Sequence, residues 1–412
     1  MSNEIYAVGL DVGTSRVRCV IGENASDGRV NIVGVGESDS KGMRRGIVTS
    51  TEAVSESIRR AVSEAERVSG IEVDSATVNI SGEHFQAENK AGVVAVAGAT
   101  KEISEDDIER AIDSASAMPL QPGWEIADRL PQEYIVDGQD GIIEPLGMTG
   151  SRLEARIHVI TSPSAGRQNL IKAIGKAGLD VETLVIEPLA AAASAINDDD
   201  REYGCALVNM GAEITSLSIY SRGAIQHIAV FPFGSTHFTK DVAVGLRVSI
   251  PQANRIKHDY GCVAKYLLSD DERQEVIEIQ PVGRTETRGL SKEILCDIMQ
   301  PRAIELLQHI SREARKVPAQ ISSGVILTGG GAMVRGMCEI AEQVFDAPTR
   351  LGYPEDDHFS GLLEQVQSPA WAVASGLASI SLEHSLKDEH GHSMSAGRRV
   401  AEWFEGFRKK IK

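Results

Sequence analysis

A strand–turn–strand pattern occurs twice in this chain of 412 residues, and it constrains the fold more than any other feature. Residues 5–22 (IYAVGLDVGTSRVRCVIG) predict a strand, a glycine turn and a second strand, and residues 30–36 predict a third. Residues 203–232 repeat this order with the strand CALVNMG, a turn, and the strands SLSIY and AIQHIAVF. Two copies of one supersecondary unit indicate a duplicated α/β architecture with one cleft between its halves.

The chain between the two copies alternates helix and strand, except in one segment. Apolar positions at helical spacing predict a helix over residues 54–68, which Gly70 ends. Residues 82–162 instead predict strands, then a helix that starts at Ser104 with a capping-box spacing to Asp107, then more strands. At roughly 150 residues per domain, the length predicts two to three domains.

The first turn of the repeated pattern has the composition of a phosphate-binding loop. It reads Asp11-Val12-Gly13-Thr14-Ser15 and lies between two predicted strands. Gly13 permits close approach of the backbone, and the hydroxyl and N–H groups beside it can hold phosphate oxygens. Asp11 can hold Mg²⁺ through water. A plain hairpin is the simpler alternative for this turn taken alone.

Two further segments place polar or glycine residues where a strand gives way to a helix. Gly329-Gly330-Gly331 follows the strand VILT and is expected to open a helix against a phosphate or nucleoside, or to be a turn without a ligand. Glu187 precedes Pro188, which suits the first turn of a helix. Glu187 can orient a water molecule, although an exposed glutamate that favours the helix dipole is the simpler alternative.

Charge and cysteine usage exclude several classes of protein. The net charge of −17 argues against binding of nucleic acid, because phosphates repel an acidic protein. Five widely spaced cysteines without a CxxC pair indicate reduced thiols in a cytoplasm and no zinc site. The start has no signal-peptide pattern, and no apolar run is long enough to span a membrane.

The C-terminal residues 398–412 differ from the acidic remainder and carry six basic side chains. At about 100° per residue they form a helix with one apolar stripe. The stripe consists of Val400, Trp403, Phe404, Phe407 and Ile411, with the basic Arg399, Arg408 and Lys410 outside it. This pattern is typical of a helix that lies in the surface of an anionic membrane. A terminal helix docked on its own domain or in a partner's groove is the alternative.

The order of these motifs resembles that of the actin-like ATPase superfamily. The order is DVGTS, EPLAAA, the second strand–turn–strand unit, LTGGG and PAWAVASGLA. Within the superfamily, the chain resembles the FtsA family of bacterial cell-division proteins. The closer match is carried by SGEHFQAENKAGVV, PQEYIVDGQDGI, EARIHVITSP, IKHDYGC, QPRAIELL and LTGGGAMVRGM, and it covers nearly the whole chain.

The resemblance implies an α/β fold of two actin-like lobes around a nucleotide cleft, with an inserted SHS2-type subdomain and a C-terminal amphipathic helix. The implied division is lobe 1 at 1–81 with 163–196 and 376–383, the insertion at 82–162, lobe 2 at 197–235 and 302–375, its subdomain at 236–301, a flexible linker at 384–397 and the membrane helix at 398–412.

The resemblance also implies a site for ATP and Mg²⁺ with weak or absent ATPase activity. The implied nucleotide-binding residues are Asp11, Gly13, Thr14, Ser15, Arg16, Glu187, Asn209, Gly211, Lys257, Gly329, Gly330 and Gly331. The second phosphate turn departs from the family pattern DIGGGTTD and reads Asn209-Met210-Gly211-Ala212-Glu213. Asn209 lacks the usual charge, and Glu213 would repel phosphates if it pointed inward. Asn254 stands where relatives often have glutamate.

The implied role is that of a cell-division adaptor. Such a protein binds the C-terminal tail of the tubulin-like FtsZ, here through Lys292 and Arg302, and anchors it to the cytoplasmic face of the inner membrane at the septum. It self-associates into filaments and recruits later division proteins. A working actin-like ATPase or sugar kinase, and a pilus-assembly protein of the same superfamily, are the alternatives.

Overall fold

The computed structural model describes residues 6–389, and its first lobe is built on a six-stranded sheet. In spatial order the strands are β11 (Asp180–Ile186), β6 (Ser75–Ile80), β1 (Tyr6–Val12), β2 (Arg16–Asn24), β3 (Val30–Asp39) and β19 (Phe359–Gly361). β1, β2 and β3 form an antiparallel meander, whereas β6, β11 and β19 join by parallel pairing. Short strands β4 (Met43–Arg44) and β5 (Ile47–Val48) form a separate hairpin.

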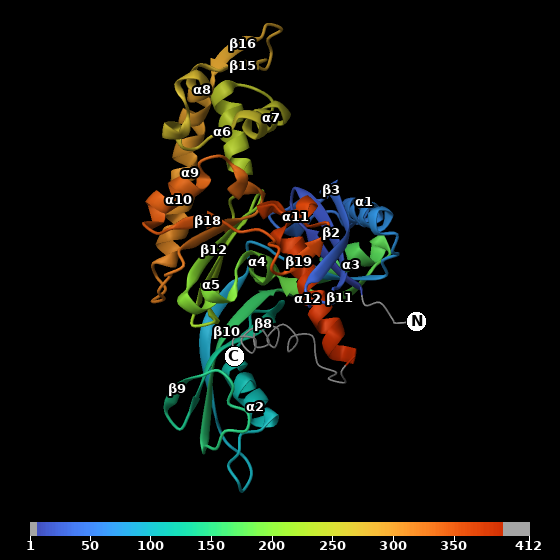
Figure 1. The fold of residues 1–412 in the computed structure, drawn as a ribbon, viewed down its shortest axis with the longest axis vertical. Coiled ribbons are helices and arrows are strands. Elements are labelled where there is room, and N and C mark those ends of the chain that lie inside the picture. Colours follow the sequence, from blue (N-terminus) through green and yellow to red (C-terminus); the bar gives the residue numbers. More distant parts are fainter. Residues whose placement is uncertain (1–5, 390–412) are drawn as a thin grey trace.

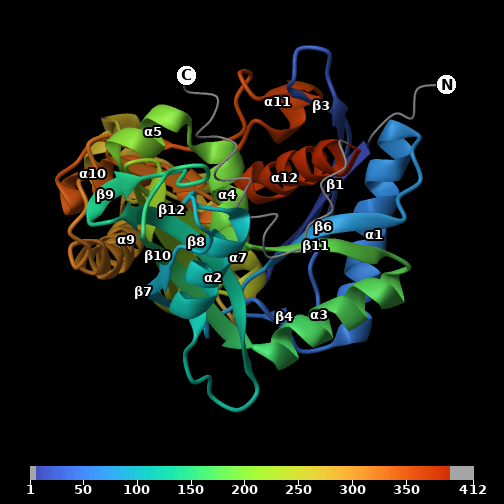
Figure 2. The same cartoon turned by 90° about the horizontal axis from the view of Figure 1, so that it is seen from below.

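Helices cover both faces of this sheet (Figure 2). α1 (Thr51–Ser69) and α3 (Ser164–Ala177) lie on one face, and α12 (Ala372–Glu389) lies on the other. Since successive side chains of a strand point to opposite faces, β1 sends Val8 and Leu10 toward α1 and Ala7 toward α12. α1 begins at the cap Ser50 and ends at Gly70, as predicted.

The second lobe repeats the meander in a five-stranded sheet. Its strands, in spatial order, are β14 (Ala224–Phe231), β13 (Thr215–Ser221), β12 (Cys205–Met210), β17 (Val325–Thr328) and β18 (Thr349–Leu351). β12, β13 and β14 are antiparallel, like β1, β2 and β3. The predicted duplication is therefore confirmed.

Two helices fill the space between the sheets, and their small residues allow very close packing. α4 (Glu187–Ala195) is buried along its whole length, and α12 packs on both α4 and β1. A Cβ atom on Gly376 of α12 would lie 1.9 Å from the carbonyl oxygen of Ala190, and one on Gly9 of β1 would lie 2.2 Å from that of Ala374. These contacts fix the position of α12 relative to β1 and α4.

Residues 82–162 form the predicted insertion, at one end of the long axis of the molecule (Figure 1). Its four-stranded sheet has the order β7-β10-β8-β9, made of β7 (Gln86–Ala95), β10 (Arg152–Pro163), β8 (Trp124–Val136) and β9 (Gln139–Ile142). α2 (Glu105–Ser116) packs on the sheet, and the predicted capping box of Ser104 and Asp107 is present.

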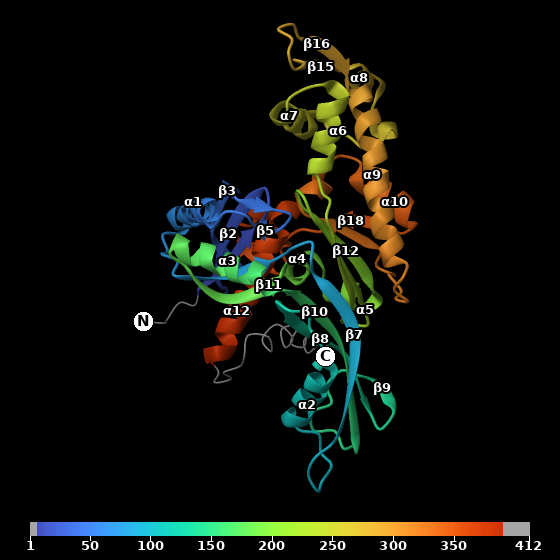
Figure 3. The ribbon, with the colours of Figure 1, turned by 180° about the vertical axis from the view of Figure 1, so that it is seen from behind.

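The opposite end of the molecule carries a smaller, mostly helical subdomain (Figures 1 and 3). Its elements are α6 (Thr236–Leu246), α7 (Ile250–Tyr260), the 3₁₀ turn Lys265–Leu267, α8 (Asp270–Gln274), β15 (Val276–Ile279), β16 (Arg288–Ser291) and the first part of α9 (Lys292–Ala314). α9 runs through the expected boundary at 301/302 with Pro301 in its interior, so the subdomain and the second lobe share one continuous helix.

Three expectations about connections are wrong. The triple glycine leads into a short 3₁₀ helix, Gly330–Met333, and α10 (Met337–Phe345) starts only after it. The segment with β19, α11 (Leu363–Val366) and the 3₁₀ turn Pro369–Trp371 falls within the range expected for the second lobe, but β19 pairs with β3 of the first. The expected linker 384–397 is helical through Glu389, because apolar residues such as Leu382 keep α12 packed on the first lobe.

The remaining described helix is α5 (Asp198–Tyr203), whose first turn is the acidic run Asp198–Asp200 and whose cap is Asn197. Within residues 6–389, no helix has the length and apolar character needed to cross a bilayer. The predicted membrane helix 398–412 lies outside the described residues.

We expect the α4–α12 contact to tolerate no added methyl group. Gly376→Ala should lower the free energy of unfolding by about 1–3 kcal/mol or more, since overpacking a dense core forces the backbone apart. Gly175→Ala on α3 is the matched control, because nothing lies within 4 Å of its added Cβ, and it should stabilise by about 0.4–1 kcal/mol. Equal effects of the two substitutions in denaturant unfolding would contradict this packing.

Candidate functional site

A cavity of about 780 Å³ lies between the two lobes, and all of the predicted nucleotide-binding residues line it. These are Asp11, Gly13, Thr14, Ser15, Arg16, Glu187, Asn209, Gly211, Lys257, Gly329, Gly330 and Gly331. The structure therefore brings together segments that lie more than 300 residues apart in the chain.

The two repeated turns have the same backbone geometry. The N–H of Gly13 donates to the carbonyl of Arg16 at 3.0 Å, and the N–H of Gly211 donates to that of Ile214 at 2.9 Å. Asp11 and Asn209 each stand two residues before the glycine, near the end of the first strand of their lobe. Since side chains alternate along a strand, both point to the side where α4 and α12 lie.

Asp11 is held by a neighbouring strand. Asn79 of β6 donates from Nδ2 to Oδ1 of Asp11 at 2.8 Å and accepts the N–H of Val12 at 2.7 Å. Burial raises the pKa of Asp11 to about 6, while the charge of Arg18 and the bond from Asn79 act in the opposite direction. This carboxylate is oriented by its neighbours, and a cation arriving beside it would favour its ionised form.

Glu187 is buried at the N-terminus of α4, so the expectation of an exposed, dipole-favouring glutamate is wrong. Its Oε1 accepts hydrogen bonds from Nδ2 of Asn209 and, at 3.3 Å, from Oγ of Ser216. Burial raises the pKa of Glu187 to about 7; the bonds from Asn209 and Ser216 lower it, and the nearby Asp11 raises it. The uncharged Asn209 thus donates a hydrogen bond to the carboxylate of Glu187, whereas an aspartate at position 209 would repel that carboxylate.

The glycine loop after β17 lies against the second turn. Gly329 has φ 81°, and a Cβ there would lie 2.3 Å from Oδ1 of Asn209. Only glycine fits both the positive φ and this close approach. A Cβ on Gly330 would meet no atom within 4 Å, so the backbone at Gly330 is open to the cavity.

Lys257 of α7, in the helical subdomain, also lines the cavity and is only 8% exposed. Its Nζ makes no ion pair or hydrogen bond with any residue in 6–389, although Asn254, one turn earlier, also lines the cavity. Burial lowers the pKa of Lys257 to about 8. The side chain of Lys257 is thus largely buried while its ammonium remains accessible from the cavity, and groups with pKa values shifted in this way concentrate at binding sites.

Glu213 turns away from the cavity and joins the two lobes. Its Oε2 accepts the N–H of Arg45, in the β4–β5 hairpin of the first lobe, at 2.8 Å. Arg45 also pairs with Glu83 at 3.0 Å, and the N–H of Gly46 donates to Oγ1 of Thr14 at 3.1 Å. The substituted second turn therefore holds the tip of this hairpin instead of repelling a phosphate.

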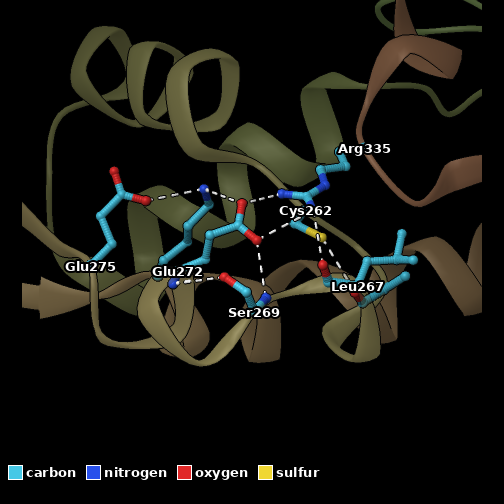
Figure 4. A network of polar contacts seen from close by, with 8 residues as sticks. Cys262, Leu267, Ser269, Glu272, Glu275 and Arg335 are labelled. Carbon is cyan, nitrogen blue, oxygen red and sulfur yellow. Dashed lines mark hydrogen bonds and ion pairs between the residues drawn. The ribbon is translucent and has the colours of Figure 1, made fainter.

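Several cationic residues of the cavity wall escaped the sequence-based prediction. Arg335 follows the glycine loop and forms two bonds with Glu272, one of them at 3.3 Å (Figure 4). Lys292, predicted to bind FtsZ, also lines the cavity and pairs with Glu272 at 3.5 Å and Glu275 at 3.1 Å. No motif indicated that these residues reach the cleft, because the fold of the subdomain brings them there.

A second overlooked group lies on the first lobe. Arg18 of β2 stacks over the ring of Trp371 at 5.4 Å, and its Nη2 pairs with Glu37 of β3 at 2.7 Å. All three residues line the cavity. The strand alternation places Arg18 on the face of Arg16, a signal that was available in the sequence.

The second residue predicted to bind FtsZ, Arg302, is separate from Lys292. It pairs with Asp241 of α6 through Nε at 2.6 Å and Nη2 at 3.0 Å, and with Glu305 at 2.6 Å. Lys292 and Arg302 stand ten positions apart on α9, or about 15 Å at 1.5 Å per residue. The structure gives them different partners and does not bring them together.

The carboxylates of the cavity suit a magnesium ion that a bound nucleotide would share. Within residues 6–389 no three His, Cys, Asp or Glu side chains cluster as a metal site. Mg²⁺ in phosphate sites usually needs only one or two protein carboxylates, with water and phosphate oxygens as its other ligands. Asp11 and Glu187 meet that need, although Oε1 of Glu187 already accepts a hydrogen bond from Asn209.

Comparison with solved structures places this fold among the actin-like proteins. The PilM protein of a PilM–PilN type IV pilus biogenesis complex covers 91% of this chain with a TM-score of 0.67 at 17% identity, over 98% of its own length. MreB5 of Spiroplasma citri bound to ADP covers 94% of this chain and 99% of its own with a TM-score of 0.56 at 13% identity. At such identities the likeness concerns the fold alone.

Sequence comparison is more specific. The family model for the cell division protein FtsA matches residues 206–376, and that for the SHS2 domain inserted in FtsA matches residues 82–161. The cell division protein FtsA of Pseudomonas aeruginosa is 37% identical over 390 residues, 94% of this chain and 91% of that protein. FtsA of Escherichia coli K12 is 30% identical over 97% of this chain and 95% of that protein. With its duplicated lobes, inserted SHS2 domain and shared cleft, this chain belongs to the FtsA family of actin-like cell division proteins.

Proposed function

We propose that the cleft binds an adenine nucleotide with little turnover, and that the chain acts as an adaptor in cell division. The observation that carries the nucleotide assignment is Lys257, whose side chain is largely buried and whose ammonium, without a partner in residues 6–389, faces a cavity bordered by three glycine-bearing turns. Phosphate oxygens are the ligands that such a cation and such exposed backbone N–H groups accept.

The state of Glu187 supports weak or absent hydrolysis. A general base must be free to take a proton from the attacking water. Here Oε1 of Glu187 accepts hydrogen bonds from both Asn209 and Ser216, and both donors stabilise its resting position. Asp11 would hold Mg²⁺ through water when the nucleotide is bound, and the ion would supply charge neutralisation for the phosphates.

We also propose that the 236–301 subdomain receives the C-terminal tail of FtsZ. Its surface exposes Val244, Val276 and Val282, and tails of this kind combine apolar and acidic groups. Lys292 and Arg302 belong to this proposal, but both already pair with carboxylates of their own chain. A tail carboxylate would therefore share or replace those partners, which favours a reversible interaction.

Membrane anchoring and self-association complete the proposed role. The stripe of residues 398–412 would insert into the cytoplasmic face of the inner membrane at the septum, as a peripheral attachment. Head-to-tail contacts without closed symmetry would give open filaments. The insertion 82–162 would form one side of that contact and recruit later division proteins. Many weakly bound tails in one filament would raise the avidity for the membrane.

The charge of Lys257 should make nucleotide binding depend on pH. Because its pKa is lowered to about 8, the ammonium loses its proton as the pH rises past 8, and ADP affinity should fall there. Lys257→Met should weaken ADP binding on the order of 10- to 100-fold and remove this pH dependence. The exposed Lys172→Met is the control. A constant calorimetric affinity of the unaltered chain between pH 7 and about 9.5 would contradict the assignment.

Restoring a carboxylate at position 209 should change both stability and chemistry. Asn209→Asp would place a second negative charge beside Glu187 and near Asp11. We expect a lower melting temperature without Mg²⁺, recovery of stability with Mg²⁺, and faster phosphate release from ATP. The exposed Asn24→Asp should change none of these. A variant with unchanged melting and unchanged phosphate release would show that the second turn is assigned wrongly.

The role of Arg302 can be separated from its structural ion pair. Arg302→Asp should weaken binding of an FtsZ-tail peptide, but it also places the new carboxylate next to that of Asp241. The double variant Asp241→Arg/Arg302→Asp restores an opposite-charge pair and should recover stability without recovering peptide affinity. If fluorescence anisotropy showed full affinity for the double variant, Arg302 would contribute to the fold and not to the tail contact.

Membrane attachment should depend on both the apolar stripe and the basic residues. Trp403→Glu should abolish flotation with vesicles of anionic lipid, because it puts a charge in the inserted stripe. Lys409→Glu, opposite the stripe, should only weaken flotation, since each basic residue contributes at most about 1 kcal/mol. Salt should reduce the binding of the unaltered chain without removing it. Equal behaviour of both variants would contradict insertion.

A further inference from the structure

Arg18 occupies a position in the cleft that an ion pair within the protein does not fully explain. Cross-strand register sets Arg18 directly opposite Asp11 on one side and Glu37 on the other. Directly opposite residues on antiparallel strands share one face of the sheet, so these three charges form a row on the cleft face. The row begins two residues before Gly13, in the first phosphate turn.

The guanidinium is fixed in place but only partly satisfied. Nη2 of Arg18 pairs with Glu37, and the planar guanidinium stacks on the ring of Trp371. The side chain of Arg18 is 15% exposed. Neither Nε nor Nη1 of Arg18 has a hydrogen-bond partner in the part of the chain that the structure describes. Nε is shielded from solvent, so the two N–H groups of Nη1 and the second N–H of Nη2 are the donors left for a ligand.

The other cations of the cavity differ from Arg18 in this respect. Arg335 and Lys292 are both bound to Glu272, and Arg16 is more exposed, with Asp39 as its partner at 2.8 Å. Lys257 has no partner among the described residues, but it lies on the second lobe. On the first lobe, Arg18 is thus the cation that is both rigid and available beside the phosphate turn.

We propose that Arg18, held by Trp371 and Glu37, binds the phosphate chain of the nucleotide from the first lobe. The assignment rests on the proposed nucleotide function and adds a phosphate-contacting residue to it. Arg18 and Lys257 would then approach the phosphates from opposite walls. A fixed guanidinium beside Asp11 would also supply part of the positive charge that a divalent cation brings, so binding should persist when Mg²⁺ is removed.

The purified full-length chain can test this by calorimetry with ADP and with uncharged adenosine, both in EDTA. Arg18→Gln should weaken ADP binding on the order of tenfold or more and leave adenosine binding unchanged. Arg18→Lys, which keeps the charge, should recover part of the loss. Arg156→Gln is the matched control, since Arg156 forms a similar cross-strand pair with Glu133, at 2.6 Å, in the insertion.

Glu37→Gln distinguishes phosphate binding from a merely structural pair. If Arg18 contacts phosphate, removing its competing carboxylate should tighten ADP binding; if the pair only fastens β3 to β2, the change should weaken it. Unchanged ADP affinity in Arg18→Gln, or equal loss for ADP and adenosine, would overturn the assignment while leaving the proposed nucleotide site intact. Failure of the unaltered chain to bind ADP would overturn the proposed function, and this assignment with it.

Discussion

The close packing of α12 against β1 and α4 is the constraint on which the rest of the cleft depends. Gly9 lets β1 approach α12, and Gly376 lets α12 approach α4, more closely than any residue with a side chain would allow. Three site groups are positioned by these elements. Asp11 is the penultimate residue of β1, Glu187 begins α4, and Trp371 immediately precedes α12. A shift of α12 would therefore move the floor of the cavity and both carboxylates at once. Dense packing of this kind transmits small displacements.

The two halves of the cleft have diverged in charge while keeping one backbone design. The turns at Gly13 and Gly211 form the same hydrogen bond, yet Asp11 keeps its carboxylate where Asn209 has an amide. That amide donates to Glu187, and Glu213 of the same turn holds the hairpin of the opposite lobe through Arg45. The second turn thus makes internal contacts through Asn209 and Glu213, whereas the first turn presents a carboxylate to the cleft. The cations that remain open to an anion, Lys257 and Arg18, stand on different lobes.

Much of this arrangement was predictable from local sequence, and the failures have physical causes. The strand–turn–strand units, the capping box at Ser104 and the cavity-lining glycines follow from short-range patterns that backbone geometry enforces. The sequence alone leaves Glu187 exposed, because its hydrogen-bond partners Asn209 and Ser216 come from two strands of the second lobe. β19 was placed in the wrong lobe because a strand of three residues carries too little periodicity to show its partner. Arg335 and Lys292 reach the cleft only through the folding of α8 and α9 around Glu272, a relation that no spacing in the sequence expresses.

The central claim is that this cleft retains a nucleotide without consuming it, and the most direct measurement is the identity of the bound nucleotide under single-turnover conditions. The purified full-length chain is mixed in excess with labelled ATP and Mg²⁺, separated from free nucleotide, and denatured for chromatography. The account predicts that the label is recovered with the protein and remains ATP. Recovery of ADP, with phosphate released at the rate of about 1 per second that is common for working enzymes, would contradict it, as would the absence of label from the protein.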